Sequence, residues 1–224
     1  MLPFDLVVFD LDGTLADTAQ DLTAALNAVL RELGRAQLPE ARVRTMIGHG
    51  ARALVRKGLA ATGVVTDQIV EQAFARFLAI YGEAICTETR PFEGAADMLD
   101  DLAARGVKTA LCTNKPEALT HDLLAGLGWS DRFAAVVGGD TLPVRKPDPG
   151  PLREAITRAG GRRPVFVGDS LTDADTARAA GVPFVAATFG YCEGPVEALG
   201  ADAIVTRFGD LLPALRTLGS ASST

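Results

Sequence analysis

The chain has 224 residues, and 48% of them are hydrophobic, which is enough apolar material for one large core or for a core with a small second unit. Its formal net charge is −6 and its lysines and arginines are scattered along the sequence, so we expect no nucleic-acid partner. Its apolar runs are shorter than the ~20 residues of a membrane-spanning helix. The three cysteines have no metal-like spacing, so we expect free thiols. The N-terminus does not resemble a signal peptide, so we expect a cytoplasmic protein with no membrane partner.

Six short apolar segments predict β-strands, and a glycine-rich turn and a helical pattern follow them. The segments are residues 6–10, 107–113, 134–139, 164–169, 183–188 and 202–205. Strands that alternate with helices in this way form a parallel sheet that is covered on both faces. We therefore predict an α/β fold with a Rossmann-like parallel sheet as its core.

The segment after the first strand predicts a separate helical unit. About a dozen residues are enough for a crossover between parallel strands, and far more than that lie between Asp10 and Val107. Helical spacing, caps and breakers predict helices at residues 17–33, 39–46, 51–61 and 66–83. We predict a small helical cap domain at 16–88, inserted into a core of residues 1–15 and 89–224, with a hinge where the chain crosses between them.

Two aspartates, Asp10 and Asp12, follow the first predicted strand with a single residue between them. Two ionised carboxylates this close disfavour each other and raise each other's pKa, unless a cation lies between them. Asp12-Gly13 is also a common turn dipeptide, so a tight turn without chemistry is the alternative interpretation.

Further polar residues follow the predicted strands in the same way. Ligands of open parallel sheets bind beyond the carboxyl ends of the strands, so Asp10, Thr113 and Asp169 converge if their strands are neighbours. A group formed by these aspartates with Asp12 and Asp173 would be costly without a cation. Oxygen ligands suit a hard ion, so the sequence predicts Mg²⁺ as a cofactor.

Four short motifs follow one another along the chain. They are DLDGT at 10–14, TNK at 113–115, KPDP at 146–149 and GDSLTD at 168–173. In this order they resemble the four motifs of the haloacid dehalogenase superfamily of phosphatases, and the resemblance covers almost the whole chain. The longer segments GGDTLPVRKPDP and LCTNKPEAL, with GHG in the inserted unit, are most similar to phosphoglycolate phosphatases.

The resemblance implies a magnesium-dependent phosphatase that acts on a small phosphorylated metabolite through an aspartyl-phosphate, with 2-phosphoglycolate as the best single candidate. It makes Asp10 the nucleophile and a Mg²⁺ ligand. It assigns Asp12 to protonation of the leaving oxygen and then to activation of water, while the backbone carbonyl of Asp12 contacts the metal. Asp169 completes the protein ligands. Asp173 holds these ligands in position without contacting the metal.

Phosphoryl transfer also needs positive charge and hydrogen-bond donors around the transferring oxygens. By the same resemblance Lys146 supplies the charge, Thr113 a hydroxyl, and Asn114 a backbone N–H. Taken singly, Thr113 is more often a strand-end residue and Lys146 a solvated surface charge. The joint order and spacing of the four motifs favour the functional interpretation.

The segment MIGHGAR at 46–52 in the inserted unit places Gly48 and Gly50 on either side of His49, just before a predicted helix. A helix start with free N–H groups can bind an anion, so these three residues are candidates for substrate specificity. The alternative is a tight glycine turn with a solvated histidine.

Other functions remain open at this point. The same motifs suit a phosphatase for a sugar phosphate, pyrophosphate or nucleotide, or a phosphomutase of the same superfamily. A dehalogenase is disfavoured because Asp12 is present, and a non-catalytic binding module has no need of the complete set of motifs. The oligomeric state is not indicated by the sequence.

Overall fold

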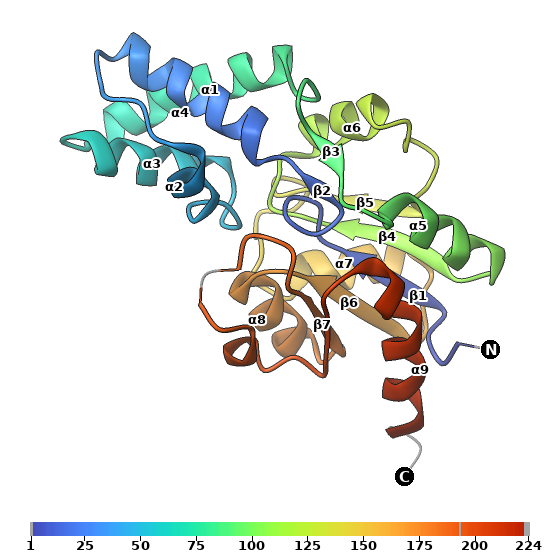
Figure 1. Cartoon of the computed structure of the whole chain (residues 1–224). Coiled ribbons are helices and arrows are strands. Elements are labelled where there is room, and N and C mark those ends of the chain that lie inside the picture. Colours follow the sequence, from blue (N-terminus) through green and yellow to red (C-terminus); the bar gives the residue numbers. More distant parts are fainter. Residues whose placement is uncertain (1, 193, 222–224) are drawn as a thin grey trace.

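The protein is an α/β structure in which a parallel sheet carries helices on both faces and a helical unit at one end (Figure 1). The computed structural model describes residues 2–192 and 194–221. Within these residues, six parallel strands form one sheet in the order β5-β4-β1-β6-β7-β8. Their bounds are β1 Leu6–Phe9, β4 Lys108–Cys112, β5 Ala135–Val137, β6 Pro164–Gly168, β7 Phe184–Ala187 and β8 Ala203–Val205. Each lies inside a segment predicted to be a strand, and the predicted fold class is confirmed.

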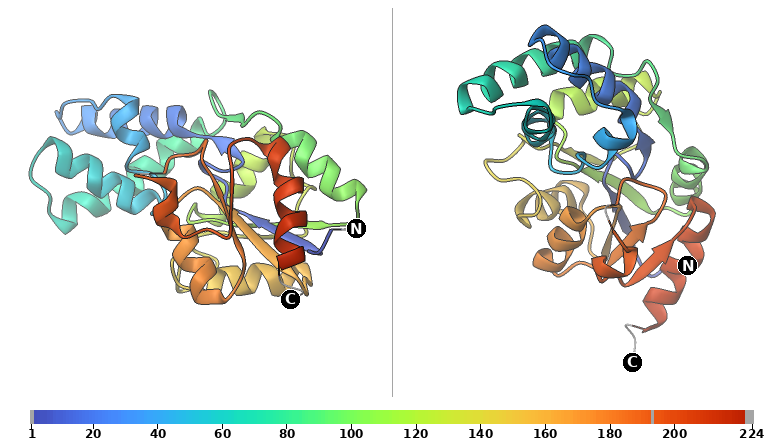
Figure 2. Two further views of the ribbon diagram at one scale, coloured as in Figure 1. Left: turned by 60° about the horizontal axis from the view of Figure 1, so that its bottom comes forward. Right: turned by 60° about the vertical axis from the view of Figure 1, so that its left-hand side comes forward.

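The central strand β1 shows why its residues are apolar throughout. Successive side chains of a strand point to opposite faces of a sheet. Val7 and Phe9 belong to the apolar cluster on one face, and Leu6 and Val8 belong to the cluster on the other. All four residues are fully buried, because helices cover both faces (Figure 2).

The helices that cover the sheet supply apolar residues to these two clusters. Leucines of α5, α6 and α9 pack with Val7 and Phe9, while residues of α7 and α8 pack on the opposite face. The bounds are α5 Ala95–Ala104, α6 Glu117–Gly126, α7 Gly150–Ala159, α8 Leu171–Ala180 and α9 Leu211–Ala221, with 3₁₀ helices at Val196–Leu199 and Phe208–Asp210. None of the helices among the described residues is long and apolar enough to cross a membrane.

The inserted unit is helical, as the sequence predicts. Between β1 and β4 the chain forms α1 Ala19–Glu32, α2 Glu40–Arg44, α3 Ala51–Thr62 and α4 Asp67–Glu83. These helices share an apolar cluster of their own, in which α1 and α3 approach closely at Gly58. A Cβ at Gly58 would lie 2.8 Å from a methyl carbon of Leu26, so the glycine permits this contact. The helical unit therefore has an apolar cluster of its own.

The two chain crossings between the helical unit and the sheet lie side by side. Short strands β2 Ala16–Asp17 and β3 Arg90–Pro91 pair in antiparallel fashion at this place. The buried carboxylate of Asp21 in α1 accepts hydrogen bonds from the backbone N–H groups of residues 87–89 and from the hydroxyl of Thr89. The returning chain is therefore fixed to the first helix of the inserted unit.

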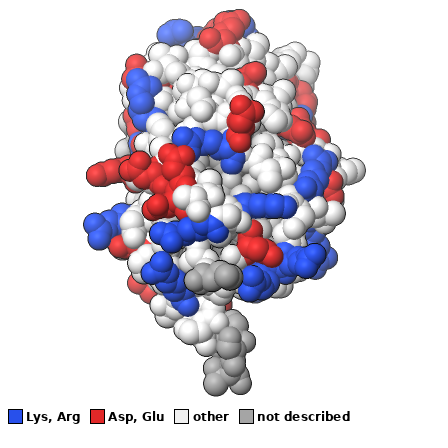
Figure 3. All heavy atoms as spheres, turned by 90° about the vertical axis from the view of Figure 1, so that its right-hand side faces the viewer, with Lys and Arg blue, Asp and Glu red and all other residues white. Residues whose placement is uncertain are grey.

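The surface carries charges of both signs. Acidic and basic side chains lie interspersed over the face shown in Figure 3. This mixed pattern is what the scattered lysines and arginines of the sequence lead us to expect.

Candidate active site

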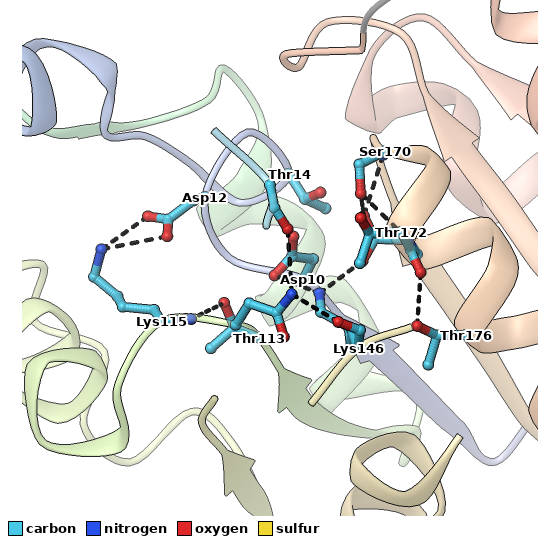
Figure 4. Close-up of polar contacts among 12 residues, drawn as sticks. Asp10, Asp12, Thr14, Thr113, Lys115, Lys146, Ser170, Thr172 and Thr176 are labelled. Carbon is cyan, nitrogen blue, oxygen red and sulfur yellow. Dashed lines mark hydrogen bonds and ion pairs between the residues drawn. The ribbon is translucent and has the colours of Figure 1, made fainter. Parts of the chain in front are cut away.

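The strand order brings the polar strand ends together at one edge of the sheet. β1 lies between β4 and β6, and Asp10, Thr113 and Asp169 directly follow these strands. The backbone N–H of Asp10 donates to the carbonyl of Val167 at 3.0 Å, which continues the sheet one residue beyond β1. Figure 4 shows Asp10 and Thr113 meeting at this edge.

Three buried carboxylates form an acidic cluster there. Ligand oxygens of Asp10, Asp169 and Asp173 all lie within 4.8 Å of one another. The buried Oδ1 atom of Asp10 makes no hydrogen bond with the described residues, although it lies 3.0 Å from Nζ of Lys146. Buried polar atoms are normally satisfied, and carboxylate oxygens are good ligands for a divalent cation. The donor set therefore suits a metal ion.

The pKa values of the acidic cluster also favour a bound cation. Burial raises the pKa of Asp10 to about 7, the charges of Asp173 and Asp12 add to the increase, and Lys146 opposes it. Burial and the charges of Asp173 and Asp10 also raise the pKa of Asp169. Without a cation the cluster holds protons at pH values where isolated aspartates are ionised, so a bound cation would displace them.

Lys146 lies beneath the cluster and is almost fully buried. Its Nζ is 3.0 Å from Oδ1 of Asp10 and 2.6 Å from Oδ1 of Asp173. The other oxygen of Asp173 accepts hydrogen bonds from the backbone N–H and hydroxyl of Ser170, at the start of α8. One oxygen of Asp173 is thus paired with a buried lysine cation and the other with Ser170, and the charge compensation by Lys146 fits a supporting position better than direct ligation.

Asp169 is held in place by two donors. The hydroxyl of Thr14 donates to its Oδ1 at 2.9 Å, and the backbone N–H of Tyr191 donates to its Oδ2 at 2.6 Å. Gly13 lies against the same carboxylate at a φ of 86°, and a Cβ there would come within 2.4 Å of Oδ2. The turn after Asp12 therefore exists, and it brings the backbone against the acidic cluster.

Tyr191 also reaches the crossing into the helical unit, a connection that the sequence analysis missed. Its hydroxyl donates to Oδ1 of Asp17 at 2.7 Å and accepts from the backbone N–H groups of Thr18 and Ala19 at the start of α1. Arg44 of α2 lies over the ring, 5.2 Å from its centroid, and pairs with Asp17. One residue thus contacts both Asp169 and the helical unit.

The carboxylate of Asp12 points away from the acidic cluster and toward Lys115 (Figure 4). Nζ of Lys115 donates to the two oxygens of Asp12 at 3.0 and 3.3 Å, and to the hydroxyl of Tyr81 in α4 at 2.8 Å. Lys115 belongs to the TNK motif, but the motif alone indicates no role for this residue. The pairing of this lysine with Asp12 depends on contacts that sequence spacing does not reveal.

A cavity lies between the sheet edge and the helical unit. The sheet side supplies Asp10, Asp12, Thr113, Asn114, Lys115, Pro116 and Leu119, and the helical unit supplies Leu22, Ile47, Gly48, Gly50, Ala51, Leu54, Phe77 and Tyr81. Both aspartates of the DLDGT motif therefore line one cavity, as general acid–base and nucleophilic chemistry requires.

The GHG segment reaches this cavity by its glycines rather than by its histidine. Gly48 and Gly50 line the cavity, whereas His49 is exposed and is not among the lining residues. The side-chain amide of Asn114 donates to the carbonyl of Gly48 at 3.3 Å and to the carbonyl of Lys146 at 3.1 Å. Asn114 thus joins the glycine segment to the sheet edge, and the role predicted for its backbone N–H stays a prediction.

Comparison with known proteins decides the family. The model of the haloacid dehalogenase-like hydrolase family matches residues 7–187. The chain belongs to this family. All four motifs that resemble those of haloacid dehalogenase phosphatases begin within the matched segment, and they meet beside the cavity of this haloacid dehalogenase-like hydrolase.

Several relatives of this haloacid dehalogenase-like hydrolase match nearly its whole length. The phosphoglycolate phosphatase of Caulobacter vibrioides is 46% identical over 217 residues, which cover 95% of this chain and 91% of that protein. The phosphoglycolate phosphatase of Rhodospirillum rubrum is 45% identical over 212 residues, which cover 92% and 88%. The crystal structure of a predicted phosphoglycolate phosphatase from Haemophilus somnus 129PT has a TM-score of 0.89 at 32% identity, covering 95% of this chain and 98% of that one.

Proposed function

We propose that this hydrolase is a magnesium-dependent phosphatase that converts 2-phosphoglycolate to glycolate and phosphate. The observation that carries the proposal is the placement of Asp10 and Asp12 on one cavity, with Lys146 and the acidic cluster behind Asp10. The relatives named phosphoglycolate phosphatase, at 45–46% identity, support the choice of substrate.

In the first step Asp10 attacks phosphorus. A carboxylate oxygen of Asp10 forms a bond to phosphorus, and the bond between phosphorus and the ester oxygen breaks. Asp12 gives its proton to the ester oxygen, so the alcohol leaves neutral. Thr113 and the backbone N–H of Asn114 would donate to the phosphoryl oxygens, and the Lys146 ammonium would offset their negative charge.

In the second step water hydrolyses the aspartyl-phosphate. Asp12, now ionised, takes a proton from the water as its oxygen bonds to phosphorus, and the bond between phosphorus and Asp10 breaks. Phosphate is released, and both aspartates return to their starting states. One carboxylate thus serves as acid and then as base, while the other carries the phosphoryl group.

Mg²⁺ held by Asp10, Asp169 and the backbone carbonyl of Asp12 would neutralise charge on the phosphoryl oxygens. Asp173 would act behind them, because its oxygens bind Lys146 and Ser170. The convergence of ligand oxygens of three buried aspartates within 4.8 Å supports this assignment over a purely structural cluster.

The lining of the cavity favours a small acid over a sugar phosphate. Among the described residues that line it, the helical unit contributes apolar side chains, two glycines and the hydroxyl of Tyr81. A sugar bisphosphate needs cations or several donors away from the reacting phosphoryl group, and the described lining side chains of the helical unit supply one hydroxyl and no cation. This composition disfavours a phosphomutase.

We further propose that residues 16–88 act as a cap on a core of residues 1–15 and 89–224. The paired crossings β2 and β3 and the separate apolar cluster of the helical unit support these limits. Rotation about the crossings would open the cavity to substrate. The specificity role of His49 and the cytoplasmic location stay predictions.

A panel of phosphate esters tests the proposed function. It contains 2-phosphoglycolate, an uncharged aryl phosphate, sugar phosphates, pyrophosphate and nucleotides, each assayed with Mg²⁺ for phosphate release. We expect the highest kcat/KM for 2-phosphoglycolate. A clear preference for a sugar phosphate or nucleotide would remove the substrate assignment, and no release from any ester would favour a binding module.

A further inference from the structure

Lys115 is a buried cation that the proposed chemistry does not use. Lys115 is the one cationic side chain among the described residues that line the cavity, and it is 4% exposed. Lys146, the other lysine near the site, lies behind Asp10 and is not part of the lining. The cavity therefore offers a substrate one positive side chain at its surface, next to two aspartates.

The position of Lys115 is set from both sides of the cavity. It contacts Asp12 of the sheet edge and the hydroxyl of Tyr81 in the helical unit, and it lies 4.5 Å from the centroid of the Tyr81 ring. A buried ion pair is weak evidence for stability, because removing two charges from water offsets much of their attraction. The buried charge of Lys115 is therefore better explained by a role in function than by a role in stability.

The distance between the ester oxygen and Lys115 determines which substrate group Lys115 can bind. Asp12 donates its proton to that oxygen in the proposed reaction, and Lys115 touches Asp12 directly. In 2-phosphoglycolate a single carbon separates the ester oxygen from the carboxylate. A carboxylate so placed comes to the immediate neighbourhood of the lysine that contacts Asp12.

We propose that Lys115 binds the substrate carboxylate, with the hydroxyl of Tyr81 as a second donor. This inference rests on the proposed function and deepens it, because it names the chemical class of the substrate. Burial raises the pKa of Tyr81 to about 12, so its hydroxyl keeps the proton that it donates. Lys115 then exchanges part of its pairing with Asp12 for the incoming carboxylate.

The class is a phosphate ester with a carboxylate on the carbon that carries the ester oxygen. Longer acids, in which further carbons intervene, place the carboxylate beyond the contact with Asp12. The assignment differs from that of His49, whose side chain is exposed and outside the lining. The two residues can be separated by experiment.

The test compares 2-phosphoglycolate with ethyl phosphate, in which a methyl group replaces the carboxylate. The variants are K115M and K115Q, with His49→Ala as the rival and Lys57→Met, a lysine of α3 outside the cavity lining, as the matched control. The amide of K115Q can still bond Tyr81 and Asp12, so this variant serves if K115M does not fold. Thermal unfolding checks the fold of each protein.

We expect the wild type to prefer 2-phosphoglycolate, and K115M to lower kcat/KM for it by about 10- to 100-fold, the loss of one or two charged hydrogen bonds. The loss for ethyl phosphate should be about tenfold smaller, since it has no carboxylate to bind, whereas any effect of the variant through Asp12 is common to both substrates. The control should keep both values.

Three results would overturn the inference. Equal losses on both substrates in K115M and K115Q would mean that Lys115 acts through Asp12. A preference that survives in both lysine variants but is lost in His49→Ala would move the carboxylate site to His49. A wild type without any preference would remove the proposed substrate itself, and this result is visible before any variant is made.

Discussion

Lys146 and Lys115 are both buried lysines that pair with an aspartate of the same DLDGT motif, and their other partners differ. Lys146 contacts Asp10 and Asp173, so the residues around its charge all belong to the sheet edge. Lys115 contacts Asp12 and Tyr81, so its surroundings are completed by the helical unit. The half of the site that would hold the phosphoryl group is built at the sheet edge, and the other half is shared with the helical unit. Variants near Lys146 should therefore lower turnover of all substrates. Variants near Lys115 should lower turnover of some substrates more than others.

The largest effect is expected for Asp10→Asn. The amide is nearly isosteric but a poor nucleophile, so kcat/KM should fall on the order of 10⁴-fold or more on 2-phosphoglycolate and on an aryl phosphate alike. Phosphate release measures the activity and thermal unfolding checks the fold. Wild-type turnover by this variant would rule out the covalent mechanism for this protein.

Removal of the metal should come next in size. Excess chelator should stop turnover of both substrates, Mg²⁺ should restore it, and Ca²⁺ should restore it poorly because its larger and looser coordination shell misplaces the reacting groups. Steady-state assays after metal exchange measure this. Undiminished turnover in excess chelator would contradict the metal assignment.

Lys146→Met should lower turnover of both substrates by about 10²- to 10³-fold, the range found when a donor to a developing charge is removed. It also leaves Asp10 and Asp173 without their shared cation, so the melting temperature should fall. Lys57→Met is again the control. A loss of turnover confined to 2-phosphoglycolate would mean that Lys146, and not only Lys115, discriminates among substrates.

The acidic cluster predicts that stabilisation by Mg²⁺ depends on pH. The pKa of Asp10 is raised to about 7 in the folded protein, against about 4 for an unfolded chain, so the folded state binds more protons between these values. In the metal-free protein this group's contribution to stability falls as pH rises through that window. Mg²⁺ binding needs ionised ligands, so the rise in melting temperature caused by Mg²⁺ should be larger at pH 8 than at pH 5. Equal shifts at both pH values would contradict the prediction.

The smallest effect is expected for Tyr81→Phe, which removes the hydroxyl that contacts Lys115. A loss of about three- to tenfold in kcat/KM for 2-phosphoglycolate corresponds to one hydrogen bond, and ethyl phosphate should change little. The ring and its stacking on Phe77 remain, so the fold should be kept. An equal loss on both substrates would mean that Tyr81 contributes to cap closure rather than to recognition.

The parts of the fold that follow from local pattern were predictable. Apolar runs such as residues 6–10 identify strands wherever they are buried on both faces, and a polar residue at the end of such a run marks the carboxyl edge. Placing Asp10 and Asp169 at one edge needed little beyond the order of the motifs. The family itself was recognised from those motifs and is confirmed.

The parts that depend on distant contacts were not predictable. The hydroxyl of Tyr81 is 34 residues from Lys115 in the sequence, and that of Tyr191 is 174 residues from Asp17. Periodicity and turn chemistry describe only near neighbours in the chain. For the same reason the glycines of GHG were recognised as a turn before a helix, while the direction of the His49 side chain was not indicated.

The chain contains two tyrosines and one tryptophan, and their positions determine how the proposed opening of the helical unit can be observed. Tyr81 and Tyr191 both lie where the helical unit meets the sheet edge, each with its hydroxyl in hydrogen bonds across that boundary. Trp129 is buried in the apolar cluster of the sheet. Opening of the cap would hydrate both phenols and leave the indole as it is, so tyrosine ultraviolet difference spectra can follow opening in the unlabelled protein while tryptophan emission serves as an internal standard.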